Sequence, residues 1–128
     1  VTLIDGEGRL EVGRGPVRTG VTAILPRGRR DARPAFGGYA VGNGNGELTG
    51  TIWVDESGVV GGPVMITNTH SVGVVRDAVI AWQLANGGTG QAWGLPIVGE
   101  TWDGYLNDLN GFHVKPEHVR AALDGARG

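Results

Sequence analysis

Short apolar runs separated by glycine, proline and asparagine recur along the chain, a pattern typical of strands joined by turns. The runs that predict strands are residues 1–4, 10–12, 21–25, 36–41, 64–67 and 95–98. The first two flank Asp5-Gly6-Glu7-Gly8 and predict a β-hairpin. Pro26 ends the third run, and glycine interrupts the fourth. Residues 27–34 and 43–46 are expected to form a loop and a turn.

Three segments show the spacing of an α-helix. The longest predicted helix runs from Ser71 to about Asn86, with an apolar stripe of Val74, Val75, Ala78, Val79, Ala81 and Trp82. A second is predicted over residues 116–126, because Pro116 suits the first helical position and Glu117 suits the first turn. A short helix is predicted over residues 47–57, ended by Gly58.

Strands and helices therefore alternate, which favours a layered α/β architecture. A chain of 128 residues fits one domain or a piece of a larger one. It ends in a helix, with only about five short strands before it. We therefore expect an incomplete domain.

Composition adds constraints on partners. Glycine supplies 25 of the 128 residues, against a usual share of ~7%, which indicates close approach of the backbone to another layer, a subunit or a ligand. The formal net charge of −2 gives no general attraction to nucleic acid or to an anionic membrane. No apolar run approaches the roughly 20 residues of a membrane span. The absence of cysteine excludes disulfides and leaves the compartment, cytoplasmic or periplasmic, open.

His70 and Ser71 are neighbours, which raises the question of a serine hydrolase site. Adjacent residues do not easily form the hydrogen bond between a nucleophile and its base, and no G-x-S-x-G elbow is present. The favoured interpretation is a strand-to-helix junction in which the Ser71 hydroxyl caps the helix. The alternative is that Asn68, Thr69 and Ser71 contact a polar part of a substrate.

Other polar groups also have a structural and a functional interpretation. The four arginines at positions 27, 29, 30 and 33 favour a solvated loop over a phosphate site. Residues 42–47 (GNGNGE) lack the Lys-Ser/Thr of a phosphate loop, so a turn is favoured. The three histidines are too scattered to predict a metal site. Residues 101–112 (TWDGYLNDLNGF) offer side-chain amides either to Asx turns or to a developing oxyanion.

Four long stretches carry a resemblance to one family: residues 15–28 (GPVRTGVTAILPRG), 43–50 (NGNGELTG), 66–78 (ITNTHSVGVVRDA) and 100–114 (ETWDGYLNDLNGFHV). Over nearly the whole chain, in this order, they resemble the DmpA-like aminopeptidases, which include β-peptidyl aminopeptidases and L-aminopeptidase/D-esterases. Such precursors cut themselves into an α and a β polypeptide. The resemblance implies that residues 1–128 are the α-chain portion of a single hydrolase domain. It further implies that a family precursor would carry additional residues before position 1 and after position 128.

The resemblance further implies an αββα sandwich, similar to that of Ntn-hydrolases but with different strand connectivity, completed by the β polypeptide. The nucleophile would be the N-terminal serine of that β chain, with its own α-amine as the base. Active enzymes would be homo-oligomers of αβ pairs acting on peptides, amides or esters of L-, D- or β-amino acids. No metal or organic cofactor is implied.

Site residues follow from the same resemblance. Asn107, in the LND motif, matches an asparagine that stabilises the oxyanion, and Tyr39 matches an active-site tyrosine. Asn43, Glu47 and His70 belong to the family's motifs and are expected to line the substrate pocket. The candidates for binding the free amine of the substrate are Glu47, Asp55 and Glu56.

Two rival hypotheses remain at this stage. An ornithine-acetyltransferase-like protein would share the self-cleaving architecture but use a threonine nucleophile and pass the acyl group to an amine. A non-catalytic binding module would be stable alone. The first residue of the partner chain distinguishes the two enzymes, because the aminopeptidase requires serine there.

Overall fold

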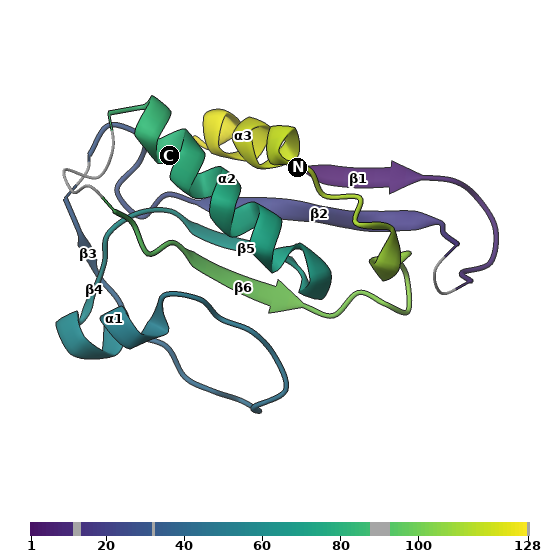
Figure 1. The fold of residues 1–128 in the computed structure, drawn as a ribbon, viewed down its shortest axis with the longest axis horizontal. Helices are drawn as coiled ribbons and strands as arrows, with labels where there is room; N and C mark the ends of the chain where they lie inside the picture. The colour runs from purple at the N-terminus through teal and green to yellow at the C-terminus, as the bar shows by residue number, and fades with distance from the viewer. Residues whose placement is uncertain (12–13, 32, 88–92, 128) are drawn as a thin grey trace.

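A four-stranded sheet forms the centre of the computed structural model, which describes residues 1–11, 14–31, 33–87 and 93–127 (Figure 1). The strands lie in the order β1 (Thr2–Asp5), β2 (Val17–Ile24), β5 (Val64–Asn68) and β6 (Ile97–Thr101). β2 is antiparallel to both β1 and β5, whereas β5 and β6 are parallel. The start of β2 therefore lies at the same edge as the ends of β5 and β6.

Two helices, α2 (Val72–Ala85) and α3 (Pro116–Gly125), pack on one face of this sheet. The core lies between them and the sheet, because alternate strand residues and the apolar helix stripes are buried together. Its buried members are Val21, Met65, Val72, Val75, Val79, Val98, Val114, Val119, Ala122 and Leu123. Burial of these side chains provides most of the driving force for folding.

No helix of the described part of the chain covers the other face of the sheet. Ile4, Ile24 and Ile66 point to that face and are 70%, 45% and 38% exposed. A sheet normally buries at least one apolar face against another layer. Both the uncovered isoleucines and the half-sandwich architecture agree with a fold that needs a further layer.

The long connection between β2 and β5 forms a small unit at one side of the sheet (Figure 1). It contains β3 (Ala35–Phe36), α1 (Thr51–Ser57) and β4 (Val59–Val60), and β3 pairs with β4. Two single 3₁₀ turns complete the structure: Thr69–Ser71 between β5 and α2, and Leu109–Gly111 after β6.

The helical periodicity predicted α2 and α3 to within one or two residues at each end. Pro116 occupies the start of α3, and Gly58 ends α1 with a positive φ of 67°. The strand predicted at 64–67 is β5, which extends to Asn68, and the one predicted at 21–25 overlaps β2 up to Ile24. Asn43 forms the predicted turn, since its Oδ1 accepts the backbone N–H of Asn45 at 3.0 Å.

The hairpin predicted for residues 1–4 and 10–12 is wrong. β1 pairs instead with β2, with Thr2 opposite Gly20 and Ile4 opposite Arg18, and residue 12 lies outside the described residues. Gly20 permits this pairing because a Cβ there would collide with the carbonyl oxygen of Val1. Such a pairing partner is a property of the three-dimensional packing and not of the local turn.

Three element boundaries also differ from the predictions. The helix predicted over 47–57 begins only at Thr51, because Gly50 has a φ of 75° and residues 47–49 run along β6 instead. The strand predicted over 36–41 is reduced to Ala35–Phe36. The strand predicted at 95–98 starts at Ile97 and continues to Thr101, since Pro96 has no N–H for the ladder.

Candidate active site

Polar side chains gather at the edge where β5 and β6 end and β2 begins. Asn68 ends β5 and Thr101 ends β6. Arg18 and Thr19 lie at the start of β2. The loop after β6 returns to this edge, because the backbone N–H of Asp108 donates to the carbonyl oxygen of Pro16 at 3.0 Å. Segments distant in the sequence therefore meet here, which is a common position for binding sites in α/β folds.

Asn107 is buried at this edge and fixed on both sides of its amide. Its Oδ1 accepts the backbone N–H of Arg18 at 3.0 Å, and its Nδ2 donates to Oδ1 of Asp103 at 3.2 Å. A helical turn positions it, since its own N–H donates to the carbonyl oxygen of Asp103 at 3.0 Å. The second proton of the amide has no hydrogen-bond partner among the described residues. An amide that is held rigidly and has one free N–H suits hydrogen-bond donation to an oxyanion.

Asn68 lies at the end of β5 and contacts β2 one residue away from the Asn107 contact. Its Nδ2 donates to Oγ1 of Thr19 at 2.7 Å, whereas its buried Oδ1 has no partner among the described residues. Thr19 directly follows Arg18, so the two asparagine side chains contact adjacent residues of β2. The sequence interpretation placed Asn68 at a strand-to-helix junction, and the structure adds its contact with β2.

A cavity of about 430 Å³ opens beside these residues on the uncovered face of the sheet. Its polar lining includes Arg18, Thr19, Asn68, Thr101 and Asp103. Asn107 lies immediately behind this lining, because it is hydrogen-bonded to both Arg18 and Asp103. The cavity is large enough for a small organic group.

Glu47 lies beside β6 at the same end of the sheet, and Asn43 lies in the turn that precedes it. The carbonyl oxygen of Glu47 accepts the N–H of Glu100 at 3.1 Å, and both predicted residues have exposed side chains. Glu100 itself accepts a hydrogen bond from Oγ1 of Thr69 at 2.5 Å. Gly46 lies against the same carboxylate, where a Cβ would be 2.6 Å from Oε1. Glycine in the NGNG turn therefore lets the turn close over Glu100.

His70 is exposed and stacks on Phe112, with ring centroids 5.8 Å apart and planes at 18°. This contact joins the end of β5 to the loop that carries Asn107. The predicted cap by Ser71 is wrong, since its hydroxyl makes no capping hydrogen bond and is buried without a partner among the described residues. The prediction that His70 and Ser71 are not a catalytic dyad agrees with this geometry, which gives no hydrogen bond between them.

Tyr39 lies apart from the other predicted residues. Its hydroxyl donates to Oδ2 of Asp55 in α1 at 2.8 Å. Figure 1 shows α1 at the end where β6 begins, whereas Asn107 follows the other end of β6. The hydrogen bond to the Asp55 carboxylate, with a contribution from burial, raises the pKa of Tyr39 above its usual value of 10.0. Tyr39 is therefore neutral at physiological pH.

The structure also adds residues that the sequence reasoning did not assign. Asp103 holds Asn107, and the spacing of four residues within a turn is the signal that could have suggested the pair. Asp108 is buried and contacts Nε2 of His113 at 3.1 Å. Gly111 leaves room for this pair, because a Cβ there would collide with His113 and lie 2.6 Å from Oδ2 of Asp108.

Two features of the described residues bear on other functions. No group of three or more histidine, aspartate or glutamate side chains is placed to hold a metal ion there. None of the helices in this part of the chain combines the length and apolar character of a membrane span.

Comparison with known proteins places this architecture. The profile of Peptidase family S58 matches residues 2–128. The solved L-aminopeptidase D-Ala-esterase/amidase from Ochrobactrum anthropi, described as a new variant among the Ntn hydrolase fold, superimposes with a TM-score of 0.83 at 43% identity, covering 96% of this chain and 35% of that one. A β-aminopeptidase from Burkholderia sp. gives a TM-score of 0.80 at 45% identity, covering 93% and 34%.

The fold is thus the Ntn-hydrolase type seen in these aminopeptidases, as the resemblance predicted. The chain belongs to Peptidase family S58. It is 60% identical over 126 residues to the β-peptidyl aminopeptidase BapA of Sphingosinicella microcystinivorans, covering 98% of this chain and 32% of that protein. The chain spans about a third of the length of the curated relatives it matches.

Proposed function

We propose that this chain supplies one part of the active site of an aminopeptidase. The remaining part is a second polypeptide made by self-cleavage of the same precursor, whose N-terminal serine is the nucleophile. The observation that carries the proposal is the buried Asn107, which is fixed by Arg18 and Asp103 and keeps one amide proton uncommitted. Family membership and the uncovered face of the sheet support the proposal that a second polypeptide completes the site.

In the proposed reaction, the serine hydroxyl attacks the carbonyl carbon of the substrate's first residue, and the serine's α-amine takes the hydroxyl proton. Asn107 donates a hydrogen bond from its free amide N–H to the resulting oxyanion. The C–N bond then breaks, the amine leaves with the proton, and an acyl-enzyme remains. Water attacks this ester and releases the amino acid. No metal or organic cofactor takes part.

The remaining predicted residues have supporting roles in the proposal. Asn43, Glu47 and His70 line the substrate side. Among the acidic candidates for binding the substrate amine, Glu47 lies at the same end of the sheet as Asn107. Asp55 is a weaker candidate, because its carboxylate accepts the hydroxyl proton of Tyr39. Tyr39 itself would position the nucleophile or the leaving group only if the complete enzyme brings α1 toward the site.

The similarity to a β-peptidyl aminopeptidase supports substrates with an N-terminal β-amino acid. The test is to incubate the full-length protein with p-nitroanilides of β-, L- and D-amino acids, and to follow p-nitroaniline release. The acyl-enzyme is then trapped and located by mass spectrometry, with the acyl group expected on the N-terminal serine of the second chain. Transfer of the acyl group to the amine of an added amino acid instead of to water would favour the transferase, and absence of any turnover would contradict the proposal.

A further inference from the structure

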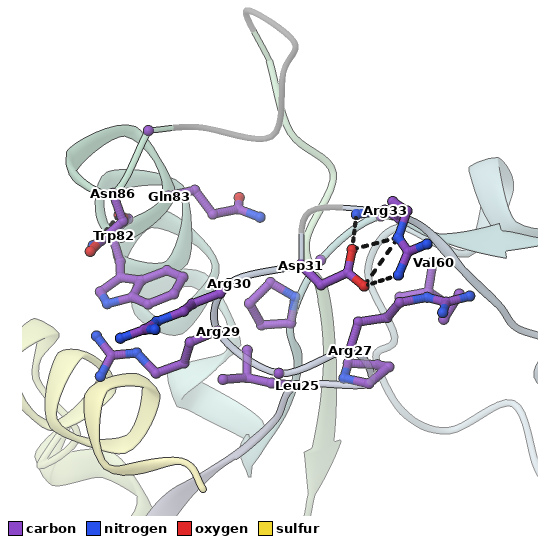
Figure 2. A pocket seen from close by; sticks show the side chains of 17 residues that line it. Leu25, Arg27, Arg29, Arg30, Asp31, Arg33, Val60, Trp82, Gln83 and Asn86 are labelled. Carbon is purple, nitrogen blue, oxygen red and sulfur yellow. Dashed lines mark hydrogen bonds and ion pairs between the residues drawn. The ribbon is translucent and has the colours of Figure 1, made fainter. Parts of the chain in front are cut away.

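A second cavity of about 430 Å³ lies at the opposite end of the sheet (Figure 2). Its walls come from the loop after β2, the segment between β4 and β5, and the last turns of α2. Pro63, which precedes β5, lines this cavity, whereas Asn68, at the other end of β5, lines the first one. The rise of a strand puts about 13 Å between the two ends of β5. The second cavity is therefore separate from the candidate active site.

Positive charge is concentrated around this cavity. Four of the chain's 11 basic residues line it, against one carboxylate: Arg27, Arg29, Arg30, Arg33 and Asp31. The chain as a whole has a formal charge of −2. The sequence favoured a solvated loop for these arginines, and all four side chains are exposed in the structure. Figure 2 shows Arg29 and Arg30 on the side of the cavity near Trp82, and Arg27 and Arg33 on the side near Val60.

Two of the four arginines are neutralised. Arg33 binds Asp31 through Nε at 2.9 Å and a terminal nitrogen at 2.6 Å, and this contact holds the pKa of Asp31 below its usual range. Arg29 binds Asp124 of α3 at 2.9 Å. Asp124 also accepts the indole N–H of Trp82 at 2.9 Å. These pairs fix the walls of the cavity.

The other two arginines have no carboxylate partner among the described residues. Arg27 donates from Nε to the carbonyl oxygen of Pro34 at 3.1 Å, which orients the guanidinium and leaves its terminal nitrogens free. Arg30 makes no hydrogen bond or ion pair with any described residue. Guanidinium groups bind carboxylate and phosphate through two parallel hydrogen bonds, so an oriented, unpaired arginine is suited to an oxyanion.

Gln83 of α2 is an independent indication of a ligand. It is only 9% exposed and lines the cavity, yet its side-chain amide has no hydrogen-bond partner among the described residues (Figure 2). The amide lies against Gly62, where a Cβ would be 2.6 Å from Nε2. The amide of Gln83 is therefore free to donate a hydrogen bond to, or accept one from, a ligand in the cavity.

We propose that this cavity binds a small organic anion. Carboxylate or phosphate groups of the ligand contact Arg27 and Arg30, and a polar group of the ligand hydrogen-bonds to Gln83. The volume lies within the range of small-molecule sites. This site is independent of the aminopeptidase proposal, since it uses none of the residues assigned to that reaction.

The test is isothermal titration of the full-length protein at low ionic strength with citrate, and separately with inorganic phosphate. The variants are R27Q/R30Q, which removes both charges, and R27K/R30K, which keeps the charges but loses the guanidinium geometry. The matched control is R9Q/R76Q, because Arg9 is exposed and Arg76 lies on the surface of α2 with Asp77 as its neighbour. Thermal unfolding of each variant checks that the fold is intact.

Saturable citrate binding is expected, weakened about tenfold or more by both R27Q/R30Q and R27K/R30K and unchanged in R9Q/R76Q. Binding of phosphate as well would show that the site accepts either oxyanion, and binding of citrate alone would assign it to carboxylates. Peptidase turnover of the variants should remain that of the wild type. The proposal is overturned if neither anion binds more tightly than about 1 mM, or if the control pair loses as much affinity as the cavity variants.

Discussion

Replacing Asn107 by alanine should impair both catalysis and stability, for separate reasons. Loss of one oxyanion donor lowers kcat by about 10²–10³. The same substitution removes the acceptor for the backbone N–H of Arg18, which is bonded at 3.0 Å in a part-buried position. An N–H left unsatisfied costs about 1–3 kcal/mol of folding free energy. The two effects can be separated by a second variant.

Asn107→Asp keeps the oxygen that accepts from Arg18 but has no N–H to donate. It therefore keeps the hydrogen bond from the N–H of Arg18. Its new charge lies beside the carboxylate of Asp103, because Nδ2 of Asn107 is 3.2 Å from Oδ1 of Asp103 in the wild type. Its kcat should fall as far as that of Asn107→Ala, whatever its stability. The matched control is Asn110→Ala, because Asn110 is exposed in the same loop.

The assay is steady-state hydrolysis of an aminoacyl p-nitroanilide by the full-length protein, with processing checked by gel and stability by urea unfolding. Removing a donor that acts only in the transition state lowers kcat and kcat/KM equally. Asn110→Ala should resemble the wild type in both measurements. The reasoning is refuted if processed, folded Asn107→Ala or Asn107→Asp turns over at close to the wild-type rate.

Three further predictions concern the fold. Asp55→Asn should lower the pKa of Tyr39, because it removes the carboxylate that raises it; ultraviolet titration of tyrosinate measures this, and an unchanged pKa would contradict the contact. In the wild type, the raised pKa of Tyr39 stabilises the folded state below pH 10. That contribution to stability is lost as pH rises through the pKa of the folded state. The alkaline loss of stability should therefore be smaller in Asp55→Asn than in the wild type. Leu123→Ala empties a fully buried position of α3 and should cost about 2–5 kcal/mol in urea unfolding; a cost below that of a surface change would refute the assigned core. Gly73→Ala, at a helical position with no atom near a new Cβ, should instead stabilise by about 0.5–1 kcal/mol, and any destabilisation would mean that the surface of α2 there is covered.

The sequence predicted the elements whose signals are local. The stripe of Val75 and Val79 placed α2, and Pro116 placed the start of α3. The pairing of β1 with β2 was missed, because strand pairing depends on residues 18 positions apart, such as Thr2 and Gly20. The start of α1 was misplaced, since only the left-handed conformation of Gly50 separates it from the segment along β6.

For the candidate site, the resemblance supplied Asn107 but not the contacts that hold it. Neither composition nor spacing shows that Arg18 and Asp103 fix its amide, because β2 and the loop after β6 meet only in the folded chain. The arginine-lined cavity was missed for a similar reason. Which arginines are neutralised depends on Asp124, which is 95 residues away from Arg29 in the sequence.

The central claim is that this chain is completed by a second polypeptide that carries the nucleophile. Intact mass and N-terminal sequencing of the purified full-length protein test this claim directly. We predict two polypeptides, of which the second begins with serine. A single uncleaved chain with full peptidase activity, or a second chain beginning with threonine, would contradict the account.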